Sequence, residues 1–402
     1  MKKIKILISL LFLSLISITN INSQINVDVG PSGDYADMTA FIDNIKSYAG
    51  ETVIARIEAG TYIGQYIIDS IGHPGYPAQL TIEPLSTNPT FEAESGLALA
   101  NNYIFLIRNS MYVTINNINF VNNNTLFSNV ITFDYYLDYI DIQNCNFTNT
   151  SSAGVDTNKS IIYFTPTAAN SAVIDIVENN FNNGSYGIYS NGAAIDLKII
   201  NNNFNDFDYC GIHLANPNFA TINENIIVST KTTGNQCGIE VDIIAPIHIR
   251  RNFIGLSGYT TNVGIACTNS DSAIIANNMI SLDGDGTNQA LQISNSYTDV
   301  VFNNIYIPYG NNNSVGLKLI NCELESFVRN NIFDVYAGYI FDFDDAVYSG
   351  YNIFNFNPSN NFAKFNSGIV TDLYEWQNSH YMDYESLLGD PQYMSSTDLH
   401  TG

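Results

Sequence analysis

Side chains that could perform acid–base chemistry occur at matching positions in this chain. A small residue followed by an apolar one recurs along the sequence, and His213 and Glu240 each come directly after such a pair, with Asp242 two residues further on. Two nearby carboxylates can act as the acid and base of glycoside cleavage. We predict catalytic roles for these three residues, and for Lys318, which could neutralise a uronate carboxylate in a lyase. Ordinary solvated side chains on an exposed sheet are the alternative.

Other residues in the same pattern could bind a sugar. Tyr189 and Gln292 take the position of His213 and Glu240 in other repeats, while His248 and Arg250 lie on the next alternating segment. Tyrosine offers an apolar ring with a polar tip, which suits a sugar surface. We predict substrate-binding roles for these four residues, with the same alternative of plain solvated positions.

Two acidic segments could bind a metal ion. The segment "LDGDGTNQ" contains Asp283 and Asp285, and "FDFDD" contains Asp342 and Asp344. Carboxylates at i and i+2 on a flexible backbone suit calcium. Neither segment matches a full twelve-residue calcium loop. Calcium is therefore the one cofactor that we infer, on a weak signal.

A tripeptide of a polar residue, asparagine and an apolar residue recurs every 21 to 34 residues. Its asparagines are Asn119, Asn146, Asn180, Asn203, Asn225, Asn252, Asn278, Asn304, Asn331 and Asn352. We predict that these ten form a single ladder at a corner of repeating coils, because asparagine tolerates left-handed backbone and stacked amides can hydrogen-bond to one another. The phenylalanine after each of the first four should point into the core.

The small-apolar pairs precede these asparagines by 14 to 16 residues. They begin at Gly187, Gly211, Gly238, Gly264, Ala290, Gly316 and Gly338, and the residues after them alternate between apolar and polar. Alternation indicates strands, and short strands at this period indicate a parallel β-helix of about ten coils. The outward stripe should then be Tyr189, His213, Glu240, Ala266, Gln292, Lys318 and Ile340.

Cysteines make one further prediction possible. Cys210 and Cys237 each precede a marker glycine on successive coils. Equivalent positions on neighbouring strands lie about 4.8 Å apart, which is within the Cα range of a disulfide. The pair could be bridged or form a stack of reduced thiols.

The flanking segments suggest how the chain is organised. Residues 1–24 have the basic and apolar regions of a secretory signal peptide. Residues 25–99 should form an N-terminal cap with a helix near Met38 and Phe41, capped by Asp34 or Asp37, followed by the first coils. Residues 100–354 are the β-helix repeats, and residues 355–402 should close the C-terminal end. The chain could be a fragment of something longer.

Composition restricts the partners. Without the three signal lysines, 38 acidic residues face 14 − 3 = 11 Lys and Arg residues, a net charge of −27. Such a field repels nucleic acid and argues against a polyanionic substrate. We expect a secreted or cell-surface monomer without a transmembrane segment.

Three segments resemble the secreted right-handed parallel β-helix proteins of the pectin-lyase-like superfamily. These are "VGPSGDYADMTAFIDNI" with "RIEAGTYIGQYII", the asparagine coils, and "LYEWQNSHYMDYESLLGDPQYMSSTDLH". The asparagine-rich composition and signal peptide look like those of a Bacteroidetes export substrate. The resemblance implies an all-β solenoid with an N-terminal capping helix and a polysaccharide partner. The catalytic motifs of polygalacturonases and pectate lyases are missing, so it supplies no catalytic residues.

Two functions fit these observations. The protein could bind, and as a lyase or glycosidase cleave, an extracellular polysaccharide. Alternatively, it could be a non-catalytic adhesin or spacer of the cell surface.

Overall fold

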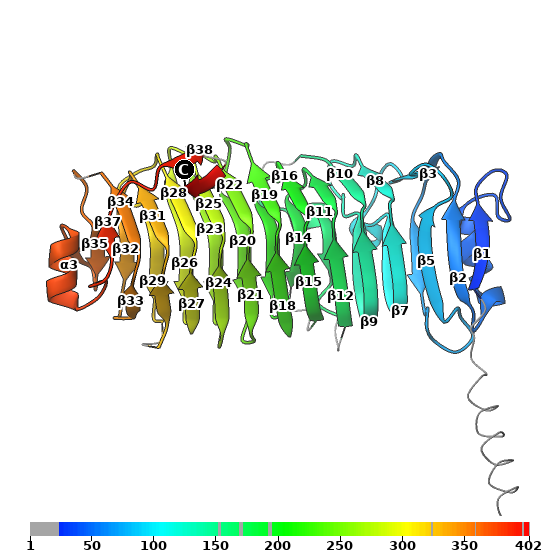
Figure 1. Ribbon diagram of the computed structural model, residues 1–402. Coiled ribbons are helices and arrows are strands. Elements are labelled where there is room, and N and C mark those ends of the chain that lie inside the picture. The colour runs from blue at the N-terminus through cyan, green and yellow to red at the C-terminus, as the bar shows by residue number, and fades with distance from the viewer. Residues whose placement is uncertain are drawn as a thin grey trace, which may run out of the picture.

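The chain winds into a rod of stacked coils, an all-β parallel solenoid (Figure 1). The computed structural model describes residues 24–151, 154–168, 172–191, 195–322, 325–357, 359–395 and 398–401. The predicted signal peptide lies outside this part of the chain, apart from Gln24. No helix among the described residues is long and apolar enough to cross a membrane.

Each coil contributes strands to three rows, two in one long sheet and one in a second sheet. The first row of the long sheet is β4 Tyr66–Asp69, β7 Phe105–Asn116, β9 Ile131–Gln143, β11 Ser160–Phe164, β14 Tyr186–Asn191, β17 Cys210–Ala215, β20 Gln236–Asp242, β23 Thr261–Thr268, β26 Thr287–Ser294, β29 Val315–Ile320, β32 Tyr339–Phe343, β35 Ala363–Phe365 and the antiparallel β36 Gly368–Val370. The second row is β1 Gln24–Val29, β2 Thr52–Ile57, β5 Gln79–Pro84, the second halves of β7 and β9, β12 Ala172–Val177, β15 Ile195–Ile200, β18 Phe219–Asn223, β21 Ile247–Arg250, β24 Ala273–Ala276, β27 Thr298–Val301, β30 Phe327–Arg329 and β33 Tyr348–Gly350.

The second sheet has one strand from each coil. Its members are β3 Thr61–Ile63, β6 Thr90–Glu92, β8 Asn119–Asn122, β10 Asn146–Asn149, β13 Asn180–Asn182, β16 Asn203–Asn205, β19 Ile226–Ser229, β22 Phe253–Leu256, β25 Met279–Leu282, β28 Asn304–Ile307, β31 Ile332–Val335, β34 Ile353–Phe356 and β37 Leu387–Leu388. A separate hairpin, β38 Tyr393–Ser395 and β39 Asp398–Thr401, lies over β28, where Asn304 donates to the Leu399 carbonyl at 2.8 Å.

The solenoid is longer than the sequence pattern predicted. The second sheet has 13 described strands, against about ten expected coils. The asparagine pattern missed the first two strands, which begin at Thr61 and Thr90, and the last, which begins at Leu387. These coils lie near the ends of the rod, where the corner has different residues.

The prediction of a single ladder of ten asparagines was confirmed at Asn225, Asn252, Asn278, Asn331 and Asn352 and wrong in register at the other five positions. The eight buried, connected asparagines are Asn179, Asn202, Asn225, Asn252, Asn278, Asn303, Asn331 and Asn352, each 0–1% exposed. Asn119, Asn146, Asn180, Asn203 and Asn304 lie one position later and face outward, because successive strand residues point to opposite sides. In pairs such as Asn202-Asn203, the predicted ladder used the second asparagine, whereas the first one is buried.

The left-handed turn is made by the residue before each ladder asparagine. Asn277 has φ 57°, while Asn278 follows it with a buried side chain. The same turn position is occupied by Glu224, Arg251 and Phe302 in other coils. The prediction that Asn278 itself adopts the left-handed turn was therefore wrong, whereas the prediction of stacked amides was confirmed.

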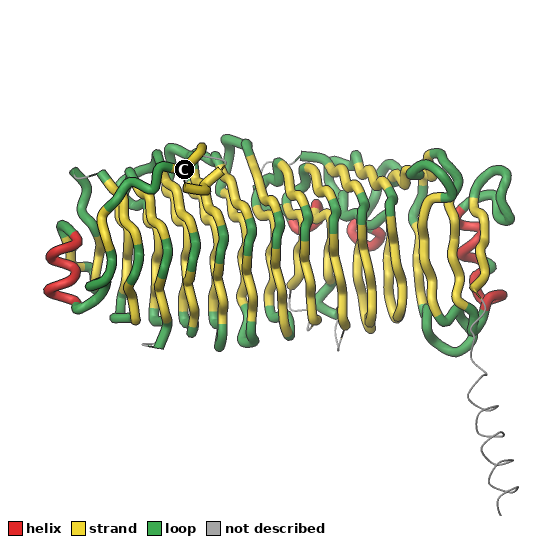
Figure 2. Tube along the Cα trace, in the orientation of Figure 1, coloured by secondary structure: helices red, strands yellow, loops and turns green. Residues whose placement is uncertain are grey.

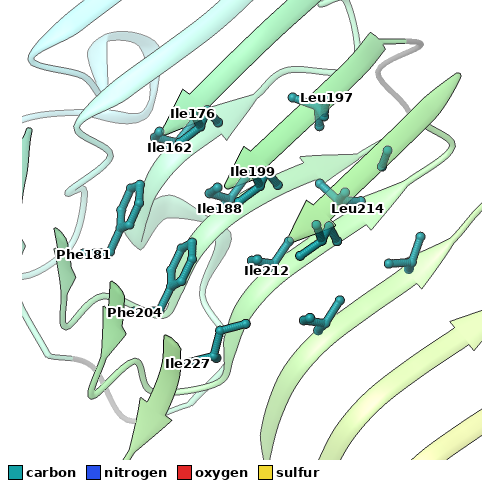
Figure 3. Packing of buried hydrophobic residues seen from close by; sticks show 14 of the residues in the cluster. Ile162, Ile176, Phe181, Ile188, Leu197, Ile199, Phe204, Ile212, Leu214 and Ile227 are labelled. Carbon is teal, nitrogen blue, oxygen red and sulfur yellow. The ribbon is translucent and has the colours of Figure 1, made fainter. Parts of the chain in front are cut away.

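The interior is packed by columns of identical or similar residues. Phe120, Phe147, Phe181 and Phe204 are 0–1% exposed, as predicted, and neighbouring rings stack 4.6–5.1 Å apart. Ile227 continues this column in the next coil (Figure 3). The interior is thus filled, so ligands must bind to outward-facing side chains.

Short helices lie at both ends of the rod (Figure 2). Helix α2, Met38–Asp43, buries Met38 and Phe41, and the Asp37 side chain accepts from the Ala40 N–H at 2.8 Å as its N-cap. It continues into η1, Ile45–Tyr48. Helix α3, Leu373–His380, buries Trp376 at the other end. Two further 3-10 turns, η2 Leu99–Asn101 and η3 Thr157–Lys159, lie along the side.

Candidate functional site

Strand register places most of the predicted site residues on one outward stripe of the first row. Rung by rung it is Leu106, Thr132, Tyr163, Tyr189, His213, Glu240, Ala266, Gln292, Lys318, Asp342 and Lys364. The prediction that Ile340 faces outward was wrong, since Ile340 is 1% exposed. Ile340, and not Gly338, lies opposite Gly316 on the neighbouring strand. The small-apolar pair that begins at Gly338 is therefore two residues out of register with the pairs of the other coils.

His213 and Glu240 are in direct contact. His213 Nδ1 lies 2.9 Å from Glu240 Oε2 on the adjacent rung. The His213 ring stacks on Tyr189 with centroids 4.8 Å apart and planes 9° apart, and Tyr189 stacks on Tyr163 at 5.8 Å and 5°. Both faces of Tyr189 are therefore covered, which leaves its ring edge for any sugar.

The remaining predicted catalytic residues are spread along the stripe. Asp242 is exposed and its Oδ1 accepts from Asn269 Nδ2 at 2.8 Å. Lys318 lies three rungs beyond Glu240, roughly 14 Å at about 4.8 Å per rung. There it forms an ion pair with Asp342 at 3.6 Å. The structure thus brings His213 to Glu240 and separates Lys318 from both.

The predicted binding residues occupy two rows. Gln292 lies on the stripe, two rungs past Glu240. His248 and Arg250 lie on β21 in the second row, where burial and the nearby Arg250 charge lower the pKa of His248. The edge of the His248 ring contacts Phe219, with centroids 5.4 Å apart.

The predicted calcium ligands lie in two separate places. Asp283 is exposed as a whole residue. Partial desolvation of its carboxyl, followed by the Asp285 charge, raises the pKa of that carboxyl. Asp342 is paired with Lys318, and Asp344 follows the end of β32. Within the described residues, the one group of three or more close acidic, thiol or imidazole ligands is Cys210, Cys237 and Glu240.

A cleft opens at the N-terminal end of the aromatic stack. It has a volume of about 180 Å³ and is lined by residues that include Leu106, Thr132 and Tyr163 from three successive rungs of the stripe. Thr132 supplies no ring that could stack on Tyr163 from the neighbouring rung. Among the described residues of the stripe, Tyr163 is the one aromatic residue that lines the cleft.

The rest of the lining is mostly polar, with Leu99 and Ala100 as the apolar exceptions. Asp134 accepts hydrogen bonds from Thr165 Oγ1 at 2.6 Å and from Thr167 Oγ1. Asn102 accepts from the Asn129 N–H at 2.9 Å and donates to the Asn158 carbonyl at 2.8 Å, which holds neighbouring coils together around the cleft. Asp134 is the only charged residue among the described residues that line it.

Burial raises the pKa of both tyrosines that line the cleft. The pKa of Tyr163 is raised by burial and by the charge of Asp134. The pKa of Tyr103 is raised by burial, which outweighs the opposing effect of Arg108. Both phenols therefore stay protonated near neutral pH and can donate hydrogen bonds.

Sequence reasoning missed this cleft. Ile161 stands where Gly187 stands one coil later, so the coil of Tyr163 has no small-apolar pair to mark it. The segment "SIIYF" does alternate correctly, and aligning it with "YGIYS" would have placed Tyr163 before Tyr189.

All five cysteines are free and buried. Cys210 pairs with Cys237 in register, as predicted, and of the two alternatives the structure has the stacked thiols.

Comparison with known proteins supports the fold. No family model matches the chain, and no curated protein matches it. The solved structures that it resembles include the GH136 lacto-N-biosidase from Eubacterium ramulus, as a selenomethionine derivative, with a TM-score of 0.50 and 10% identity over 86% of this chain and 68% of that one. The native form of that enzyme gives 0.49 at 11% identity, over 91% and 67%. PfbA, a surface adhesin of Streptococcus pneumoniae, gives 0.35 at 12%, over 85% and 92%. At such identities the likeness concerns the fold alone.

Proposed function

We propose that this protein binds a neutral extracellular glycan in the cleft beside Tyr163. The observation that carries the proposal is that Tyr163, which ends an aromatic stack, lines a cleft together with amide, hydroxyl and carboxylate side chains. A sugar ring has an apolar face and a rim of hydroxyl groups, so an aromatic surface beside amide, hydroxyl and carboxylate groups matches both.

Charge selects among glycans. The chain has a formal net charge of −24, and no described residue that lines the cleft is a lysine or arginine. Arg108, the cross-strand neighbour of Asp134, is already paired with Asp69 at 2.8 Å. A uronic or sulfated polymer would therefore meet Asp134 without a free cation, which opposes binding. Neutral sugars are therefore the favoured class, whereas a uronate lyase would require a cation that the cleft does not supply.

Binding without cleavage is better supported by this cleft than hydrolysis. Glycoside hydrolysis commonly uses two carboxylates on either side of the bond, and Asp134 is the one carboxylate among the described lining residues. The GH136 enzyme shows that a related solenoid can support a glycosidase, but it carries no residue over to this chain. A rod with a glycan-binding side cleft also suits a surface adhesin.

Binding can be tested with residues 25–402 on an array that contains neutral, uronic and sialylated glycans. We expect neutral glycans to bind and acidic ones to be weak. Tyr163→Ala should reduce the affinity for the best neutral glycan about tenfold or more by calorimetry, since that step corresponds to about 1.4 kcal/mol.

Tyr348→Ala is the matched control. Tyr348 is also outward and stacked, on Phe327 at 5.4 Å, but it lies in the second row near the other end of the rod. Its substitution should leave affinity unchanged. Absence of binding to any neutral glycan, or equal losses for the two variants, would contradict the proposal.

A further inference from the structure

A small apolar cluster lies outside the main core, on the outer face of the first row. It contains Tyr186, Cys210 and Cys237, which are 0–5% exposed, and Tyr189 and Tyr209 pack against it. The other three cysteines lie elsewhere, and Cys145 belongs to the main core. Two thiols are thus held together beside tyrosine rings, outside the main core.

A local irregularity brings a carboxylate to these thiols. Gly238 and Ile239 both face inward: a Cβ at Gly238 would lie 2.7 Å from Cγ2 of the core residue Ile254, and Ile239 is 0% exposed. Cys237 and Glu240, three residues apart, therefore project from the same side of β20. A regular strand would place residues of odd spacing on opposite faces.

The ligand atoms converge closely. Cys210 Sγ, Cys237 Sγ and one carboxylate oxygen of Glu240 all lie within 4.8 Å of one another. His213 Nδ1 lies 2.9 Å from Glu240 Oε2 and can hold that carboxylate in place. The Glu240 carboxylate thus lies between an imidazole and two buried thiols.

We propose that Cys210, Cys237 and Glu240 bind a zinc ion, with His213 orienting the Glu240 carboxylate. Two thiolates and a carboxylate on a tetrahedral centre suit zinc, whereas calcium takes oxygen ligands only. Binding releases the two thiol protons to solvent, and the ion compensates the charge of both thiolates. Three protein ligands leave the fourth tetrahedral position for water.

The three ligands come from two neighbouring coils: Cys210 lies on β17, whereas Cys237 and Glu240 lie on β20. Zinc would cross-link these successive rungs of the solenoid.

Cobalt provides a direct probe. Residues 25–402, reduced, stripped with a chelator and freed of both reagents, should take up one Co²⁺ per chain and develop a thiolate-to-cobalt charge-transfer band in the near ultraviolet. Zinc should abolish that band, and competition with a chromophoric chelator should give its affinity. Zinc should also raise the unfolding midpoint by mass action.

Variants assign the ligands. Cys237→Ser should lose at least half of the charge-transfer intensity at saturation, because one thiolate remains, and at least about a hundredfold in zinc affinity. Glu240→Gln should keep a weaker band with about tenfold lower affinity. Cys145→Ser is the control, because its serine keeps the donor that Cys145 gives to the Gln143 carbonyl at 3.2 Å, and it should bind like the unchanged chain.

Several outcomes would overturn the proposal. One is the absence of the charge-transfer band in the folded, reduced chain, and another is a zinc affinity of Cys237→Ser equal to that of the unchanged chain. The third is a Cys210–Cys237 disulfide in the isolated protein, if the protein still takes up no zinc after that disulfide is reduced. Tyr163→Ala should bind zinc normally, so failure of the glycan proposal is distinguishable from failure of this one.

Discussion

The backbone N–H and the side-chain Nδ2 of Asn252 both donate to Oδ1 of Asn278, each over 3.0 Å. Nδ2 of Asn252 also donates to the Ile222 carbonyl of the preceding coil at 3.0 Å. Each ladder amide therefore satisfies backbone groups of its neighbours at a corner where strand pairing is interrupted. Buried polar groups without such partners would cost stability.

Asn202→Ala should destabilise the rod by about 3 kcal/mol, because the N–H and Nδ2 of Asn179 both lose their acceptor in a buried place. Asn203→Ala, one residue away on the half-exposed outer side, should cost less than about 1 kcal/mol. Urea unfolding followed by circular dichroism measures both. Similar costs for the two variants would contradict the assigned register.

Asp383→Ala should destabilise the C-terminal end by about 3 kcal/mol. The buried Asp383 carboxylate accepts from Trp376 Nε1 at 3.1 Å, from Asn352 Nδ2 at 2.8 Å and from Ser386 Oγ at 2.6 Å, so it joins α3 to the end of the ladder. Tryptophan fluorescence should report early unfolding of this end. Asp390→Ala, at an exposed position, is the control and should unfold like the unchanged chain.

Asp334 should make stability fall as pH rises. Burial raises its pKa to about 6, although Asn355 donates to the carboxylate at 3.0 Å. Between pH about 4 and 6 the folded chain holds a proton that the unfolded chain has lost, so the penalty appears as pH increases through this range. Asp334→Asn should be more stable than the unchanged chain by about 1–2 kcal/mol at pH 7, and nearly equal at pH 4. Chemical unfolding at both pH values checks this, and a pH-independent difference would contradict it.

Thr132→Tyr should close the cleft without unfolding the rod. A ring at this rung would stack on Tyr163 and fill the 180 Å³ space, as Tyr163 already stacks on Tyr189. We expect at least a tenfold loss of glycan affinity with an unfolding midpoint within a few degrees of the unchanged chain. Thr132→Ser is the conservative control and should retain binding. Unchanged affinity in Thr132→Tyr would place the glycan elsewhere.

The solenoid could be predicted from the sequence because its signals are local and repeated. Alternation of apolar and polar residues, glycine at Gly238 and Gly264, and asparagine at Asn252 and Asn278 recur at one period, and each reflects a constraint within a single coil. The same regularity predicted the inward phenylalanines, and the His213–Glu240 contact followed from equal positions on adjacent coils.

Three features were decided only by the tertiary structure. The ladder register depended on which of two adjacent asparagines points inward, and a one-residue shift reverses every side chain. The cleft depended on Thr132, which has no aromatic ring, being the neighbour of Tyr163 on the next rung. Neither residue type by itself predicts that neighbourhood. The approach of Glu240 to Cys210 and Cys237 depended on two consecutive inward residues in β20 and on the stacking of coils 27 residues apart in sequence. Local patterns determined the coil, whereas contacts between coils determined where a ligand can bind.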